Sequence, residues 1–107
     1  MTLAWVYLVA AGLLEIAWAL GLKMSNGFTR PWITAGTIVL MILSFGLLAL
    51  AMRSLPMGTS YAVWTGIGIV GTAVLGIVFL NEPASALRLA CIVLILAGIV
   101  GLKLASP

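Results

Sequence analysis

The chain has 107 residues, of which 64% are hydrophobic and 7% are charged, and its formal net charge is +3. The length fits one domain, and the composition excludes an ordinary soluble globular protein. The five basic residues are scattered near loop ends and form no basic patch, so we expect no nucleic-acid partner.

Four apolar blocks alternate with three short polar stretches. Each block approaches the ~20 residues that a helix needs to cross a bilayer, and backbone groups in lipid must be satisfied within the segment. We therefore predict an all-α integral membrane protein with one four-helix transmembrane domain over residues 1–107. The expected helices cover about 3–22, 32–52, 58–80 and 86–104, and the short linkers favour an antiparallel, up-down-up-down bundle.

The first block contains "AAGLLEIAWALGLK", with Glu15 inside an apolar run. The block lacks a basic leading region, so we do not interpret it as a secretory signal. A carboxylate in hydrocarbon costs ~2.5 to 3.5 kcal/mol on insertion scales, so Glu15 should face the bundle interior or a water-filled cavity. Gly12 and Trp18 lie three residues away on the same face, where they offer space, an N–H donor and an aromatic surface. The alternative is a structural or permanently protonated Glu15.

In the second block, Ser44 is the deepest hydroxyl on a face that it shares with Thr34, Thr37 and Met41. It is a candidate site residue, and a hydroxyl bonded back to its own helix is the alternative.

In the third block, Tyr61 and Trp64 share a stripe with Gly68, and we favour a site role for both aromatic residues. Trp5 and Trp32 fit the interfacial aromatic belt instead.

The third block also contains "GIGIVG", which satisfies the spacing of a dinucleotide-binding motif. That motif needs a strand, a turn and a helix, so its place inside one apolar run excludes it. Gly66 and Gly68 instead permit a helix bend or close packing, and both interpretations stay open.

The fourth block carries small residues near one face, which favours dimer packing over packing within the chain. These residues are Ala90, Ala97, Gly98 and Gly101. Cys91 is the single cysteine and is expected to be a buried, inert thiol. With no His and no Asp, the sequence predicts neither a metal site nor a cofactor.

A single membrane carboxylate among aromatic and hydroxyl groups suggests one site for which a cation and a proton compete, which is the basis of antiport. Four helices are too few to enclose such a site, so a homodimer is expected. Two basic residues fall on the side of the N-terminus and three on the other, a balance that allows insertion in both orientations. An enzyme is not expected, because no nucleophile and base pair is visible.

The chain resembles the small multidrug resistance family over nearly its whole length, through Glu15, "GFTR", "LPMGTSYAVWTGIG" and the Gly-rich last block. "EIAWALGLK", with Trp18 three residues after Glu15, resembles the guanidinium-exporter subtype. The resemblance implies an antiparallel, dual-topology homodimer in the bacterial inner membrane that exports a small guanidinium-like cation in exchange for protons.

By the same resemblance, Glu15 is the substrate and proton site, and Gly12, Trp18, Ser44, Tyr61 and Trp64 surround it. Gly66 and Gly68 match a bend. A broader exporter of quaternary ammonium or hydrophobic cations and a non-transporting subunit of a larger complex remain as alternatives.

Overall fold

A computed structural model of the chain describes residues 2–105. Regular structure in this range consists of four α-helices: α1 (Thr2–Met24), α2 (Pro31–Ala51), α3 (Met57–Phe79) and α4 (Ala86–Ala105). Each is apolar and long enough to cross a membrane. A helix of 20 residues is about 30 Å long, which matches the hydrocarbon thickness of a bilayer. The expected fold class, an all-α membrane protein with four spanning helices, is confirmed.

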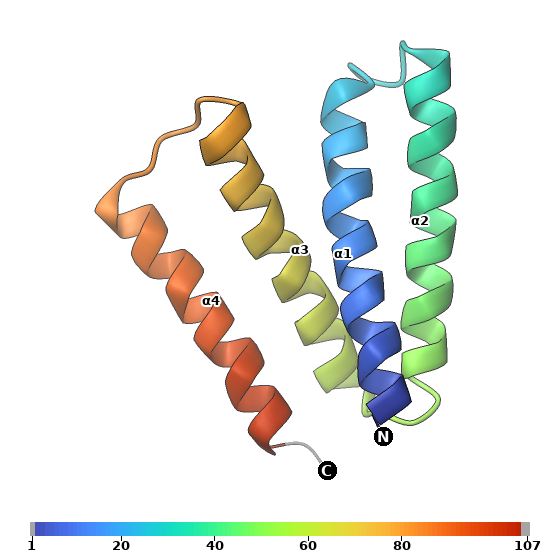
Figure 1. The fold of residues 1–107 in the computed structure, drawn as a ribbon, viewed down its shortest axis with the longest axis vertical. Helices are drawn as coiled ribbons and strands as arrows, with labels where there is room; N and C mark the ends of the chain where they lie inside the picture. Colours follow the sequence, from blue (N-terminus) through green and yellow to red (C-terminus); the bar gives the residue numbers. More distant parts are fainter. Residues whose placement is uncertain (1, 106–107) are drawn as a thin grey trace.

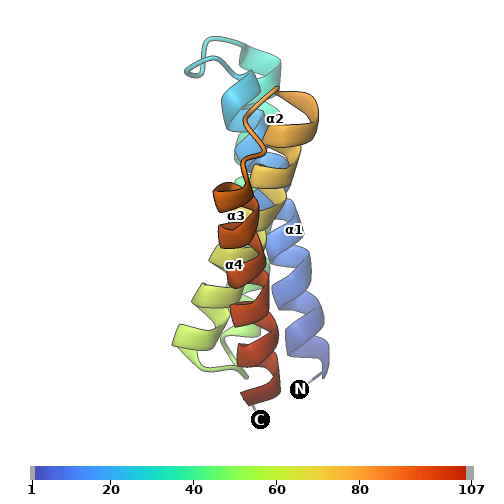
Figure 2. The same ribbon diagram turned by 90° about the vertical axis from the view of Figure 1, so that its left-hand side faces the viewer.

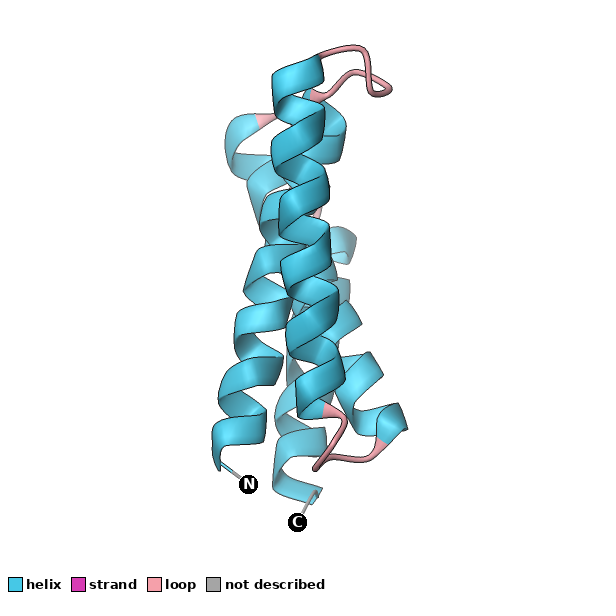
Figure 3. Ribbon diagram, turned by 90° about the vertical axis from the view of Figure 1, so that its right-hand side faces the viewer, coloured by secondary structure: helices cyan, strands magenta, loops and turns pink. Residues whose placement is uncertain are grey.

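The helices form a flat layer in the order α2, α1, α3, α4 (Figure 1). Helices that follow one another in the chain run antiparallel, so the neighbours α1 and α3 run parallel. The layer measures 42 × 35 × 16 Å, and Figure 2 and Figure 3 view it edge-on. Lipid tails cover apolar side chains as well as another helix does, so no hydrophobic force closes the layer into a compact bundle. One copy of the chain therefore leaves both faces of the layer open.

The buried core lies where α1 meets α2 and α3. Ala4, Trp5, Leu8 and Ala11 form its α1 side, at the spacing of one helical face. The expectation that Trp5 belongs to the interfacial belt is wrong, because this spacing turns its ring into the core, where it is 8% exposed. Trp32, at the start of α2, is 90% exposed, as a belt residue would be.

A tight turn joins α1 to α2. The Ser25 hydroxyl donates to the Leu22 carbonyl at 2.8 Å and accepts from the Phe28 N–H at 3.2 Å. Gly27 has φ of 71°, a conformation that glycine adopts without strain. Pro31 then opens α2, where its missing N–H costs nothing. The turn thereby sets α1 and α2 side by side and antiparallel.

Within residues 2–105, the backbone of α4 approaches that of α3 alone, Lys103 reaches the Trp5 ring of α1, and none of the residues of α4 is buried. Ile95 and Ile99 of α4 lie over Gly66, which brings the two helices together. Cys91 is exposed, so the expectation of a buried thiol is wrong. The cause is the single contact face of α4, which leaves Cys91 outside it.

Candidate functional site

Glu15 lies in the middle of α1, and its carboxyl group packs against Gly68 of α3 so closely that a Cβ atom at Gly68 would collide with it. Glu15 Oε1 is buried and has no hydrogen-bond partner among the described residues. A buried acceptor without a donor is costly, so this oxygen is expected to meet a donor that the chain does not supply. A proton or a cation with N–H groups satisfies that need.

A fully buried hydroxyl links the three helices around this point. Ser44 Oγ donates to the carbonyl of Ala11 at 2.7 Å and accepts from Trp64 Nε1 at 3.0 Å. The alternative considered above, a Ser44 hydroxyl bonded to its own helix, is therefore wrong. Thr37 does bond in that way, to the carbonyl of Ile33 at 2.8 Å. Ser44 thus fixes Trp64 of α3 relative to α1.

Four aromatic rings form a continuous chain across the layer. Trp18 meets Phe45 edge-on with ring centres 6.0 Å apart, and Phe45 meets Trp64 edge-on at 5.8 Å. The Tyr61 and Trp64 ring centres lie 5.5 Å apart. Sequence reasoning missed Phe45, because a single phenylalanine in an apolar helix looks the same whether it faces lipid or a site. The structure places it between two residues that the sequence did single out.

Two further polar groups near Glu15 are buried without a hydrogen-bond partner in residues 2–105. They are Trp18 Nε1 and Thr65 Oγ1. Trp18 lies about one turn after Glu15 on α1, and Thr65 lies about one turn before Gly68 on α3. Three of the six buried polar atoms without a partner in the described residues thus lie within about one helical turn of the contact between Glu15 and Gly68, where water or a polar ligand could satisfy them.

The two glycines predicted to bend α3 contact side chains of different helices. Gly68 receives the Glu15 side chain, whereas Gly66 faces Ile99 of α4, away from the carboxylate. The space expected beside Glu15 at Gly12 is filled by Ile67. Since α3 is one uninterrupted helix here, its glycines serve as contact points for neighbouring side chains, and a bend at Gly66 and Gly68 stays a prediction.

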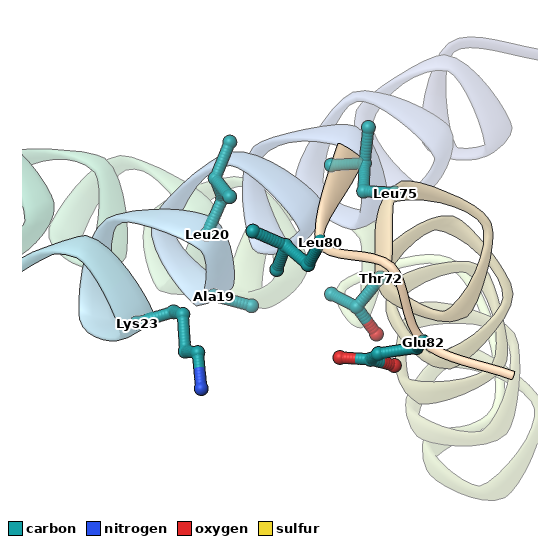
Figure 4. A pocket seen from close by; sticks show the side chains of 7 residues that line it. All are labelled: Ala19, Leu20, Lys23, Thr72, Leu75, Leu80 and Glu82. Carbon is teal, nitrogen blue, oxygen red and sulfur yellow. The ribbon is translucent and has the colours of Figure 1, made fainter. Parts of the chain in front are cut away.

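A hollow of about 190 Å³ lies beyond Glu15, toward the end of α1 (Figure 4). Ala19 and Thr72, one turn beyond Glu15 and Gly68, contribute to its walls. Lys23 extends from α1 on one side of it, and Glu82 lies on the other side, after α3 (Figure 4). The hollow thus carries one positive and one negative side chain at its walls.

The small residues of α4 lie on the side turned away from α3. Ala90, Ala97, Gly98 and Gly101 are all exposed. A Cβ atom at Gly98 or Gly101 would have no other atom within 4 Å. This face is free to receive a second helix at close range.

The bond between Ser44 and Trp64 is testable by a double-mutant cycle. Ser44→Ala should lower the free energy of unfolding in detergent micelles by about 1 to 2 kcal/mol, because it leaves the Trp64 N–H unpaired. In the Trp64→Phe background, Ser44→Ala should lower the free energy of unfolding by less, because no Trp64 N–H is left without a hydrogen-bond acceptor. Equal costs of Ser44→Ala in both backgrounds would contradict this bond.

Comparison with known proteins bears on this site. A family model described as Small Multidrug Resistance protein matches residues 3–95. The chain is 62% identical over 104 residues to the guanidinium exporter of Yersinia pseudotuberculosis serotype I (strain IP32953), covering 97% of this chain and 100% of that one. It is 56% identical over 104 residues to the guanidinium exporter of Escherichia coli (strain K12), covering 97% and 99%.

These relatives carry the names of transporters and not of enzymes. Four apolar spanning helices, a carboxylate held within them and a family match over most of the chain agree with one another. The chain belongs to the Small Multidrug Resistance protein family.

Proposed function

We propose that this chain exports guanidinium, or small guanidinyl cations, across the bacterial inner membrane in exchange for protons. The observation that carries the proposal is the buried Glu15 Oε1, which has no hydrogen-bond partner in residues 2–105 and lies against Gly68. Relatives at 62% and 56% identity named guanidinium exporters support the choice of substrate.

The chemistry of guanidinium suits this site. Guanidinium is a planar fork of N–H donors, and a carboxylate accepts two of them side by side. Its flat, charged surface is also attracted to the face of an aromatic ring, and Trp18, Phe45, Trp64 and Tyr61 form an aromatic wall. The Glu15 carboxylate and an aromatic wall would therefore recognise both the charge and the shape of the cation.

Proton coupling follows from competition for Glu15. A carboxylate that holds a cation is ionised, and the departure of the cation leaves a buried charge that takes up a proton. Only one of the two ligands occupies Glu15 at a time. If the protein exposes Glu15 to either side of the membrane only when one ligand is bound, inward proton flow drives outward cation flow.

A second copy of the chain completes the transport path. The flat layer cannot surround a cation, and a copy inserted in the opposite orientation would place a second Glu15 across a shared site near the midplane. The exposed face of α4, with Gly98 and Gly101, offers a contact for this dual-topology homodimer. The near balance of basic residues at the two membrane surfaces fits insertion in both orientations.

A panel of cations tests the substrate. Purified protein in proteoliposomes should exchange guanidinium and methylguanidinium for protons, and tetrapropylammonium should produce at most about a tenth of that rate, because it has no N–H to give to Glu15. The readout is proton movement reported by a trapped pH-sensitive dye, with protein-free liposomes as the control. Equal rates for all three cations would favour the broader exporter of hydrophobic cations.

A further inference from the structure

A cleft of about 280 Å³ opens between α1, α3 and α4, and the function proposed above makes no use of it. All three helices contribute apolar walls, which include Val9, Val63, Ile67, Ile99 and Val100. The side chains of Val9 and Val100 are exposed, so the cleft is open at the surface of a single chain.

The walls of the cleft on α3 point to another side of that helix than Tyr61 and Thr65 do. On α3, Val63 follows Tyr61 by two residues and Ile67 follows Thr65 by two residues. Two residues correspond to a rotation of about 200° around the helix axis. The two pairs therefore project to opposite sides of α3. Ile67, which also packs against Gly12, separates the cleft from the surroundings of Glu15.

A positive charge stands at one end of the cleft. Lys103, in the last turn of α4, also lines it, and its Nζ lies 4.8 Å from the centre of the Trp5 ring. This cation–π contact with a ring that is only 8% exposed holds the ammonium at the mouth. In the part of the chain that the structure describes, the one ion pair joins Arg88 to Glu82, so no carboxylate of these residues pairs with Lys103.

The depth of these groups in the membrane matches the two parts of a phospholipid. Lys103 and Trp5 lie close to the ends of α4 and α1, at the membrane surface. Val9 lies four residues after Trp5, and Ile99 lies four residues before Lys103. Both are therefore about 6 Å deeper in the bilayer than Trp5 and Lys103. A cation at the depth of the headgroups thus stands over an apolar groove at the depth of the acyl chains.

We propose that this cleft binds an anionic phospholipid, with its phosphate against Lys103 and one acyl chain along Val9, Ile67 and Ile99. A zwitterionic lipid carries its own ammonium group, which already neutralises its phosphate, so an anionic headgroup is preferred. The bound chain fills the space between α4 and α1. It thereby supports α4, whose backbone approaches α3 alone within the described residues.

Native mass spectrometry of the full-length protein in detergent tests the headgroup. Titrated with phosphatidylglycerol and phosphatidylcholine of the same acyl chains, the wild type should bind the first about fivefold more tightly. Lys103→Gln should abolish this preference. Arg53→Gln is the matched control, because it removes a positive charge at the same membrane surface outside the cleft, and it should keep the preference.

A second pair of variants tests the groove. Val9→Phe should fill the cleft and weaken the binding of both lipids, whereas Val39→Phe, at an exposed position of α2 outside the cleft, should leave both unchanged. Equal affinity of the wild type for both lipids, or equal losses in Lys103→Gln and Arg53→Gln, would overturn the proposal. The proposal would also be overturned if Val9→Phe removed the dimer from the mass spectrum but left lipid binding unchanged. That result would show that a second chain, and not a lipid, fills the cleft.

Discussion

Replacing Glu15 with glutamine is expected to abolish guanidinium transport while the protein still folds in the membrane. Glutamine keeps the size of the side chain but cannot ionise, so it neither pairs with the cation nor exchanges a proton. The loss of a buried charge partner should weaken guanidinium binding at least about a hundredfold. Transport in proteoliposomes should fall to the rate of protein-free liposomes, and size-exclusion chromatography should report an unchanged assembly.

Glu82 provides the matched control, because it is the only other acidic residue. It lies in the linker after α3 and pairs with Arg88 at 3.3 Å, an exposed contact that contributes little to stability. Glu82→Gln should keep transport within about twofold of the wild type. A Glu15→Gln variant that still exchanges guanidinium for protons, or one that fails to assemble, would refute the role given to Glu15.

Adding one methyl group at Gly68 is expected to have the next largest effect. A Cβ atom there would collide with the Glu15 carboxyl group, which is the flexible end of its side chain and can move aside. Gly68→Ala should therefore leave the fold intact and displace the carboxylate. Losing its paired hydrogen bonds to the cation should weaken guanidinium binding roughly ten- to a hundredfold, as measured by the concentration dependence of transport.

Gly36→Ala is the control for the added methyl group. Gly36 lies on α2, and a Cβ atom there would have no other atom within 4 Å. Since alanine favours a helix over glycine by about 1 kcal/mol, this variant should be at least as stable as the wild type and transport normally. If Gly68→Ala also transports normally, the contact between Glu15 and Gly68 does not position the carboxylate.

The existence and extent of the four helices were predictable because lipid imposes a simple rule on the sequence. Runs of about 20 apolar residues must be helical, and polar linkers must end them. The observed helix ends differ from the expected ones by at most two residues, as at Met24, where α1 continues past the predicted end at residue 22. Such differences are usual at helix ends.

The arrangement of the helices was less predictable. Apolar patterning does not distinguish a lipid-facing side from a protein-facing side in a membrane helix, because both are apolar. Trp5 and Cys91 show the consequence, since the first is buried in the core and the second is exposed. The flat layer also had no signal in the sequence, whereas the small residues of α4 did indicate a face that does not pack within the chain.

The candidate site was predictable where polar residues interrupt apolar helices. Glu15, Ser44 and Trp64 stand out for this reason, and the structure connects Ser44 with Trp64 directly. Phe45 and the contact of Gly68 with Glu15 depend on how α2 and α3 pack against α1. No residue type marks that packing in advance.

The most direct test of the account is the coupling of guanidinium to protons in proteoliposomes. With guanidinium concentrated inside and no pH difference at the start, the outward guanidinium gradient should drive protons inward and acidify the lumen. Reversing the guanidinium gradient should make the lumen alkaline, and Glu15→Gln should abolish both changes. Guanidinium efflux without any change of luminal pH, or proton flow that ignores the direction of the guanidinium gradient, would contradict exchange of the two ligands at one carboxylate.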